Sequence, residues 1–286
     1  MRVAILGVGL IGGSIGLATR ARTNADVCGY DPDAAALQAA LELGAIDEQA
    51  GDIATAVAGA QVVFAAAPVG MLASTVSQAL AHAPPDCVIS DVGSTKLALE
   101  EARDDPRFVG GHPIAGSEKA SIWNASKDLF KGATWYLMAT PATDPALLGR
   151  LQDLIERLGA HPQAAAADAH DRIMACVSHL PHVLANVLVQ QALAVFERED
   201  ADPLANPSLR DATRVAGANT AIWADIYLAN RAALIAAIDE LGGRLDDVRG
   251  ALASGDAAAL MAWNESARTA RRALTGEEPA DPARDA

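Results

Sequence analysis

The sequence predicts an α/β protein in which a doubly wound parallel β-sheet is followed by an all-α domain. From residue 2 to about residue 166, short apolar stretches of strand length alternate with helical segments, and several strands are apolar throughout. Such strands are typical of a parallel sheet that helices cover on both faces. From about Asp168 onward, long helical periods follow without a convincing strand.

The first apolar strand, residues 2–6, runs directly into Gly7-Val8-Gly9-Leu10-Ile11-Gly12. Between a strand and a helix, this G-x-G-x-x-G spacing is the Rossmann-type dinucleotide fingerprint. Its glycines permit a tight turn, close approach of a pyrophosphate and close packing of helix on strand. Asp31 follows the second strand, residues 26–30, where an acidic side chain can bind the ribose hydroxyls. We therefore expect NAD to bind through Gly7, Gly9, Leu10, Ile11, Gly12 and Asp31.

The alternation continues through the rest of the predicted sheet domain. We expect helices at residues 34–43, 71–81, 96–102 and 145–158, and strands at residues 61–67, 87–92, 108–111, 135–140 and 161–166.

The second part of the chain is predicted to be helical. Candidate helices cover residues 170–196, 209–216, 222–252 and 256–274, and a loop with Pro203 and Pro207 separates the first two. We therefore predict a dinucleotide-binding domain at 1–167, a helical substrate and dimerisation domain at 168–275, and a flexible tail at 276–286. The helical domain is rich in alanine and leucine, and we expect a homodimer that buries it; the alternative is a bundle that is stable without a partner.

Composition excludes several classes of protein. The 286 residues are 51% hydrophobic and 20% charged, which is an ordinary globular balance. The net charge of −14 argues against nucleic acid or an anionic membrane as partner. Three scattered cysteines, Cys28, Cys87 and Cys176, form no C-x-x-C pair, so neither a disulfide framework nor a metal site is expected.

The apolar run from Arg2 to Ala18 also has features of a secretory signal. Glycines interrupt that run at turn spacing, and no small-x-small cleavage site follows it. No later apolar stretch of membrane-spanning length is expected either. The sequence therefore indicates a soluble, cytoplasmic protein without a membrane partner.

Polar clusters follow two of the predicted strands, at the edge where parallel sheets bind ligands. The first is Asp91-Val92-Gly93-Ser94-Thr95-Lys96, in which Ser94 and Thr95 act at the site or only cap the next helix. The second, residues 110–118, contains His112 directly after a strand and two glycines, and before Pro113. We expect His112 to be held on a constrained turn.

Two further clusters lie in the helical part. His179 and His182, in Ser178-His179-Leu180-Pro181-His182, share a face if they lie on one helix, and Pro181 favours a kink or a helix start. They could bind a metal, but no cysteine or carboxylate ligand set accompanies them, so none is predicted. Arg214 is either a snorkelling surface residue or the cation that an anionic substrate needs in this acidic protein.

As a set, these residues resemble the prephenate dehydrogenase family, which includes arogenate and cyclohexadienyl dehydrogenases of tyrosine biosynthesis. The matching segments are GVGLIGGSIG at the start, DVGSTK at 91–96, GGHPIAGSE at 110–118, SHLPH at 178–182 and DATR ending at Arg214. They extend over nearly the whole chain. Ser121 departs from the family, in which many members carry glycine after the Ser-Glu pair.

The resemblance implies an NAD-dependent oxidative decarboxylation of prephenate to 4-hydroxyphenylpyruvate. His112 then serves as the base that takes the proton of the ring hydroxyl, a choice that the chemistry of a neutral histidine also favours. Ser94 bonds the same hydroxyl or orients His112, and Arg214 binds a substrate carboxylate. By the same resemblance His182 lines the side-chain pocket and Glu118 gates or tunes the site, while His179 is a further candidate for substrate binding or a structural residue.

Other classes fit less well. A short-chain dehydrogenase needs Tyr-x-x-x-Lys, and none of the three tyrosines has a lysine four residues later. A 3-hydroxyacid dehydrogenase of the 6-phosphogluconate type carries its catalytic lysine in the helical region, but no lysine follows Lys131. A non-catalytic NAD sensor is expected to have lost polar residues that are all present here. Arogenate or dual (cyclohexadienyl) specificity stays open.

Overall fold

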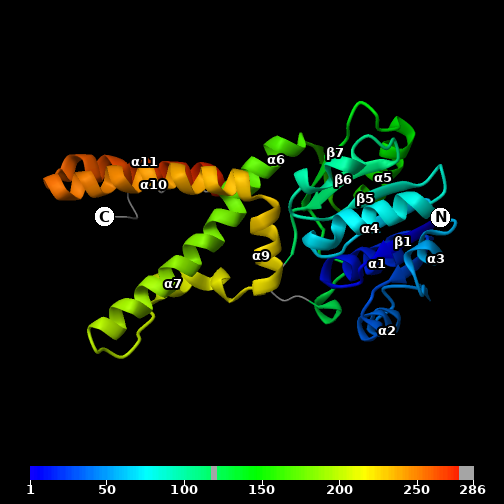
Figure 1. Cartoon of the computed structure of the whole chain (residues 1–286), viewed down its shortest axis with the longest axis horizontal. Coiled ribbons are helices and arrows are strands. Elements are labelled where there is room, and N and C mark those ends of the chain that lie inside the picture. Colours follow the sequence, from blue (N-terminus) through cyan, green and yellow to red (C-terminus); the bar gives the residue numbers. More distant parts are fainter. Residues whose placement is uncertain (117–120, 277–286) are drawn as a thin grey trace. The chain divides into compact units, whose positions relative to one another are not determined.

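Figure 1 shows the chain as a computed structural model, which describes residues 1–116 and 121–276. By its packing the chain divides into two compact units, Met1–Leu234 and Ile235–Ala286. The first unit contains the sheet together with the helices up to the start of α10.

The sheet of the first unit has eight strands in the described part of the chain, in the order β3-β2-β1-β4-β5-β6-β7-β8. This order reverses direction between β1 and β4, as in a doubly wound dinucleotide-binding fold, so the prediction of fold class is confirmed. The strands are β1 (Arg2–Leu6), β2 (Asp26–Tyr30), β3 (Glu48–Gln49), β4 (Val62–Ala65), β5 (Val88–Asp91), β6 (Phe108–Pro113), β7 (Thr134–Met138) and β8 (His161–Ala164).

One pairing departs from the predicted parallel sheet, because β7 runs antiparallel to β6. The described parts of the connection between them contain one short 3₁₀ helix, Ile122–Asn124, and no crossover helix. A parallel neighbour needs such a crossover, whereas an antiparallel one does not. In this register His112 lies opposite Tyr136.

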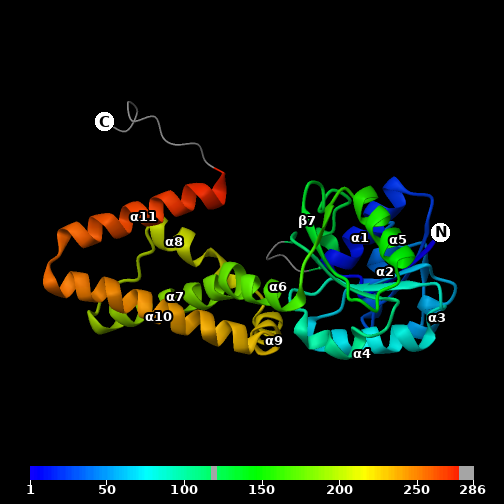
Figure 2. The same ribbon diagram turned by 90° about the horizontal axis from the view of Figure 1, so that it is seen from above.

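Helices cover both faces of the sheet, as Figure 2 shows. One face packs against α1 (Leu10–Arg22), α2 (Ala34–Glu42) and α5 (Pro145–Arg157), and the other against α3 (Ile53–Val57) and α4 (Val69–His82). Sequence analysis missed α3 and β3, since five and two residues are too few to establish a period. The predicted helix at 96–102 is a 3₁₀ helix, Leu97–Ala102.

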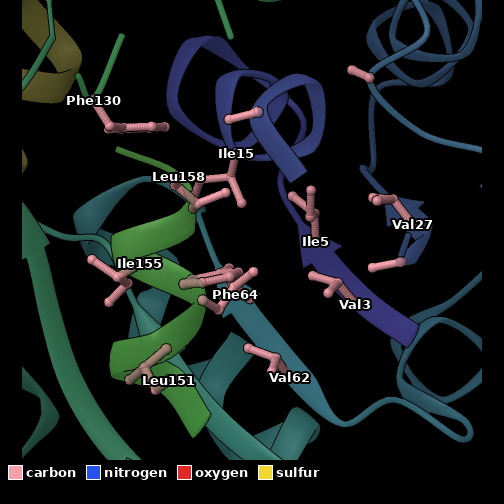
Figure 3. Packing of buried hydrophobic residues seen from close by; sticks show 14 of the residues in the cluster. Val3, Ile5, Ile15, Val27, Val62, Phe64, Phe130, Leu151, Ile155 and Leu158 are labelled. Carbon is pink, nitrogen blue, oxygen red and sulfur yellow. The ribbon is translucent and has the colours of Figure 1, made fainter. Parts of the chain in front are cut away.

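The core between the sheet and α1, α2 and α5 is built from interlocking aliphatic and aromatic side chains (Figure 3). Ile5 and Phe64 from adjacent strands are fully buried against Ile15 of α1 and Ile155 of α5. Trp135 extends this core, with its ring centroid 5.9 Å from that of Phe64. This packing fixes the carboxyl edge of the sheet, from which the site is built.

The helical part departs from the predicted helices at two breaks. The predicted helix 170–196 is α6 (Ala167–Met174), a π-helical turn (Ala175–His179) and α7 (Leu180–Arg198), so Pro181 does mark a helix start. The predicted helix 222–252 is α9 (Thr220–Ala229) and α10 (Arg231–Ser254), separated at Asn230. Between α7 and α9 lie α8 (Pro207–Thr213) and a 3₁₀ helix, Arg214–Gly217. The predicted domain boundary at 167/168 lies within the first unit and stays a prediction.

The second unit contains most of α10 and α11 (Ala257–Thr275). Gly255 adopts a φ of +66° at the turn between them, and the Asp256 carboxylate caps α11 by accepting from the Ala259 amide. The predicted tail lies, from residue 277 on, outside the described residues.

The segment Ala167–Arg198 is long and apolar enough, by length and composition, to cross a membrane. The pair α9 and α10 passes the same test only together, across a 90° bend. The expectation that no such stretch follows the N-terminus was therefore wrong. Within the segment Ala167–Arg198, Val187, Leu188 and Leu193 of α7 are exposed. Near the start of the segment, His170 and Asp171 are buried and make polar contacts with His112 of β6 and with the Lys96 loop.

Candidate active site

The glycine-rich turn forms a cradle at the carboxyl end of β1. Helix α1 begins at Leu10 after Gly9, without a side-chain cap, so the first amides of this helix have no partner within the helix. A methyl group at Gly12 would overlap the carbonyl oxygen of Gly7, and only glycine lets α1 approach so closely. The donor set of this turn fits a pyrophosphate.

Asp31 lies at the end of β2, beside this cradle. Its Oδ2 accepts from the Val8 amide at 2.9 Å and its Oδ1 from the Asp33 amide at 2.9 Å. The carboxylate is thus anchored at the turn where the ribose of a dinucleotide binds in this fold. Pro32, Asp33 and Ala34 follow it and supply no cation for a 2′-phosphate.

A buried ion pair between Asp91 and Lys96 supports the next part of the edge. The Lys96 ammonium bonds the Asp91 carboxylate and also donates to the Gly111 carbonyl at 2.7 Å. Asp91 in turn accepts from the amides of Gly93 at 2.8 Å and Gly111 at 3.0 Å. Burial lowers the pKa of Lys96, and the Asp91 carboxylate opposes that shift. The pair therefore holds the backbone immediately before His112.

His112 is the penultimate residue of β6 and is half-buried. The strand can bring it this close to β5 because residue 111 is glycine: a Cβ there would lie 2.6 Å from Ser90 Oγ. The constrained turn predicted at His112 was therefore wrong: the residue lies in strand backbone, paired with Tyr136 of β7 and supported from β5 by Asp91.

The ring of His112 bonds a second histidine. His112 Nδ1 lies 2.8 Å from His170 Nε2, and His170 Nδ1 lies 2.8 Å from Asp171 Oδ1. His170 and Asp171 are 2% and 1% exposed. The Asp171 carboxylate also accepts from the amides of Lys96 and Leu97 at 2.9 Å. A carboxylate, a buried imidazole and the candidate base are therefore connected in series.

The surroundings of His112 favour its neutral form. Burial lowers its pKa well below the ordinary 6.5, and positive charge on Lys96, His170 or His179 lowers it further. A neutral imidazole can accept a proton, which is the state that a general base requires.

Ser94 lies in the loop between Asp91 and Lys96. Its hydroxyl is buried and has no hydrogen-bond partner among the residues that the structure describes, and the same is true of Thr95. No side-chain cap is seen on the following 3₁₀ helix, so the capping role considered for both residues is wrong. Ser94 does not orient His112 here, because the Ser94 hydroxyl bonds no described residue. An unpaired buried hydroxyl is suited to a substrate group.

His179 is fully buried at the end of the π-helical turn. Asn230 Nδ2 lies 3.2 Å from His179 Nδ1 and donates to the Asp171 carbonyl at 2.7 Å. Because the amide nitrogen of Asn230 can only donate, His179 Nδ1 accepts and Nε2 carries the proton. Burial lowers the pKa of His179 to about 4, so the ring is neutral. Its Nε2 has no partner within the described part of the chain.

His182 stacks on Trp223, with ring centroids 3.3 Å apart. Its Nδ1 donates to the Ser178 carbonyl at 3.2 Å. Burial lowers the pKa of His182, and the nearby positive charge of Arg214 contributes. The two residues predicted to bind the substrate side chain thus lie close enough to interact, although Arg214 itself is exposed.

The structure therefore brings His112, His179 and the Ser94 loop into contact with one network, and places His182 beside Arg214. Glu118 lies outside the described residues. Among the residues described, no cluster of three or more histidine, cysteine, aspartate or glutamate side chains could hold a metal ion.

Sequence analysis missed His170, Asp171 and Asn230, and gave Lys96 no role. One signal was available, because adjacent histidine and aspartate side chains open a long helix that is otherwise largely apolar. Apart from the bond between His170 and Asp171, the partners of the three missed side chains lie 51 to 75 positions away in the sequence, and no local pattern shows that connection.

Comparison with known proteins matches both parts of the chain to one family. The prephenate dehydrogenase nucleotide-binding domain matches residues 15–163, and the prephenate dehydrogenase dimerization domain matches residues 166–265. The chain belongs to the prephenate dehydrogenase family. The resemblance carried by its motifs is thereby confirmed.

Individual members of the prephenate dehydrogenase family match over nearly the whole chain. The chain is 33% identical to prephenate dehydrogenase of Bacillus subtilis, over 95% of this chain and 76% of that protein. It is 32% identical to cyclohexadienyl dehydrogenase of Zymomonas mobilis, over 98% of each. The crystal structure of A. aeolicus prephenate dehydrogenase with hydroxyphenyl propionate and NAD+ has a TM-score of 0.86 and 26% identity, covering 96% of this chain and 98% of that one.

Proposed function

We propose that this protein is an NAD-dependent prephenate dehydrogenase, which converts prephenate oxidatively to 4-hydroxyphenylpyruvate and carbon dioxide. The observation that carries this proposal is the half-buried, neutral His112, held at the carboxyl edge of a dinucleotide-binding sheet. Family membership over both parts of the chain supports the same reaction.

The cofactor would be held by Gly7, Gly9, Leu10, Ile11, Gly12 and Asp31. The amides at the start of α1 would bind the pyrophosphate, and Asp31 would accept hydrogen bonds from the ribose hydroxyls. Bound there, NAD+ supplies the acceptor for the hydride. The anchored carboxylate of Asp31 favours NAD+ over NADP+, because it repels a 2′-phosphate.

His112 takes the proton of the ring hydroxyl while hydride leaves the same carbon. Loss of carbon dioxide returns its bonding electrons to the ring and makes the product aromatic. The unpaired hydroxyl of Ser94 would bond the reacting oxygen, and the Nε2 proton of His179 is a second donor for the substrate.

The anionic side chain of the substrate needs a cation in this acidic protein. Arg214 supplies a planar pair of donors for a carboxylate, next to His182. Glu118 is proposed to gate or tune the site.

A second candidate function is arogenate or dual specificity, which the similarity to a cyclohexadienyl dehydrogenase favours. The side chain of prephenate carries a ketone where that of arogenate carries an ammonium group.

The direct test is formation of NADH, followed by absorbance at 340 nm, with prephenate and with arogenate. Steady turnover that requires prephenate and NAD+ supports the proposal. Binding of NAD+ without turnover of either substrate would instead identify a sensor. The ratio of kcat/KM for the two substrates decides between the candidate functions.

Replacing the base tests the central assignment. We expect His112→Asn to lower kcat by about 10²- to 10⁴-fold, because a positioned general base is lost, with little change in substrate binding. Wild-type kcat should rise with pH as the base becomes deprotonated. A variant with near-wild-type turnover would move the base to another residue, and His182 would be tested next.

We also propose a cytoplasmic homodimer formed through the helical part. Apolar side chains of α7, α10 and α11 are exposed in the single chain, among them Leu193, Ile235 and Met261. The matching domain is described as a dimerization domain in this family. Light scattering after size exclusion would measure the mass, and a monomer at micromolar concentration would refute the dimer.

A further inference from the structure

The candidate base is the outer member of a series of three side chains. His112 contacts His170 through one ring nitrogen, and His170 contacts Asp171 through its other nitrogen, each at 2.8 Å. His170 comes from α6 and His112 from β6, so the contact joins the helical part to the sheet. Nothing in the role of His112 as a base requires a second buried histidine behind it.

Hydrogen-bond accounting assigns the protons along this series. The Asp171 carboxylate can only accept, so His170 Nδ1 carries a proton. In a neutral ring, His170 Nε2 is then an acceptor, and the facing Nδ1 of His112 must donate. His112 is left with an unprotonated Nε2. This is the nitrogen that points away from His170 and can take a proton.

We propose that His170, held by Asp171, is a positioning residue that fixes His112 in the Nδ1-protonated tautomer and shares the proton that His112 receives. This inference deepens the proposed function, because it assumes that His112 is the base. Without the series a histidine can take up either tautomer, and the form protonated at Nε2 cannot act as a base toward the substrate.

The proton balance of the step is simple. The hydroxyl proton of the substrate moves to His112 Nε2, while the hydride and carbon dioxide leave as described above. His112 is then positively charged, and its Nδ1 proton is shared with, or passes to, His170 Nε2. His170 keeps its Nδ1 proton on the bond to Asp171. The carboxylate thus stabilises the charge without becoming protonated.

Charged and titratable groups surround this pair from every element that packs against it. Lys96 and His179 disfavour a positive charge on His112, and Lys96 is itself paired with Asp91. Tyr136 of β7 contacts the His170 ring edge-on, with centroids 5.7 Å apart. Asp171 is the carboxylate that hydrogen-bonds the pair directly, so stabilisation of the imidazolium must come through His170.

Two substitutions of His170 separate its two roles, which are to accept a hydrogen bond from His112 and to share the proton that His112 receives. His170→Gln keeps an oxygen that can accept from His112 Nδ1, but it cannot be protonated. His170→Leu removes both capacities. The matched control is Met174→Ala, one turn later on α6, which is buried and bonds no member of the series. All three proteins are compared by thermal unfolding, so that a packing defect is recognised.

We expect His170→Leu to lower kcat about 10²-fold at nearly constant KM, and to move the rising limb of the pH profile about one unit lower. His170→Gln should recover about tenfold of that loss. Met174→Ala should lower the melting temperature and keep the wild-type kcat and pH profile. Equal kcat and equal profiles in His170→Leu and wild type would overturn the proposal.

A second readout needs no turnover. In protein labelled with ¹⁵N-histidine, long-range proton–nitrogen correlations report the tautomer of each ring. We expect Nδ1-protonated His112 in wild type and His170→Gln, and a mixture or the Nε2 form in His170→Leu. An unchanged tautomer in His170→Leu would refute the positioning role. Failure of the proposed function would appear separately, as absence of NADH formation by the wild-type protein, and failure of the base assignment as undiminished activity of His112→Asn.

Discussion

Acid should destabilise this protein through His179, and His179→Gln should remove that part of the effect. The ring is fully buried, and burial lowers its pKa from 6.5 to about 4. Between these values the unfolded chain binds a proton that the folded chain does not. Stability is therefore fully present above pH 6.5, and it falls as the pH drops toward 4.

The size of the effect follows from the two pKa values. Each pH unit within the interval costs about 1.4 kcal/mol, so the whole interval corresponds to about 3 kcal/mol and the step to pH 5.5 to about 1.4 kcal/mol. A glutamine can still accept from Asn230 but does not titrate in this range.

The free energy of unfolding is measured by urea titration with tryptophan fluorescence at pH 7.5 and pH 5.5. We expect the loss between these values to be about 1.4 kcal/mol smaller in His179→Gln than in wild type. Comparing losses cancels the contributions of His112 and His182, whose pKa values are also lowered. His161→Gln, at an exposed position, is the control. The same loss in wild type and His179→Gln would show that His179 is not held neutral by the fold.

Three further substitutions test the cofactor, substrate and loop assignments. Asp31→Ser should shift the ratio of kcat/KM toward NADP+ by about tenfold or more, since a like charge is removed; an unchanged ratio would place the ribose elsewhere. Arg214→Ala should raise the KM for prephenate about 10- to 100-fold without changing the Kd of NAD+, because a charged hydrogen bond is worth about 1.5 to 3 kcal/mol. Arg210→Ala, on the preceding helix, is the control and should leave the KM unchanged. Ser121 has a φ of +127°, a backbone conformation that favours glycine, so Ser121→Gly should stabilise the fold by about 1 kcal/mol and raise the melting temperature. A lower melting temperature would mean that the hydrogen bond from the Trp123 amide to the Ser121 hydroxyl outweighs the backbone strain.

The elements of the sheet could be predicted because their periodicity is local. Apolar strands alternate with amphipathic helices, and β1, β2 and α5 lie where that pattern puts them, to within a residue. The direction of β7 could not be predicted, since an antiparallel strand has the same local pattern as a parallel one. The break between α9 and α10 at Asn230 could not be predicted either, because it depends on contacts that are distant in the sequence. Asn230 leaves the helix to bond Asp171 and His179, which are distant in sequence.

The site was predictable only where a motif marks it. The candidates His112, His182 and Arg214 lie in recognisable segments, and the glycine turn predicts the place of the cofactor. Ser121, singled out where many relatives carry glycine, has the backbone conformation that favours glycine. His170 and Asp171 were not found, because their importance comes from the contact of α6 with β6 and with the Lys96 loop.

The bonds of Asp171 also bear on the order of folding. One residue accepts from the Lys96 and Leu97 amides through its carboxylate and from Asn230 through its carbonyl, so it closes two loops of 75 and 59 residues. Contacts of such sequence separation form late, since loop closure must precede them. A refolding chain would therefore regain its helices, whose contacts are local and visible by circular dichroism, before the base acquires its support, and catalytic activity would return in a slower phase.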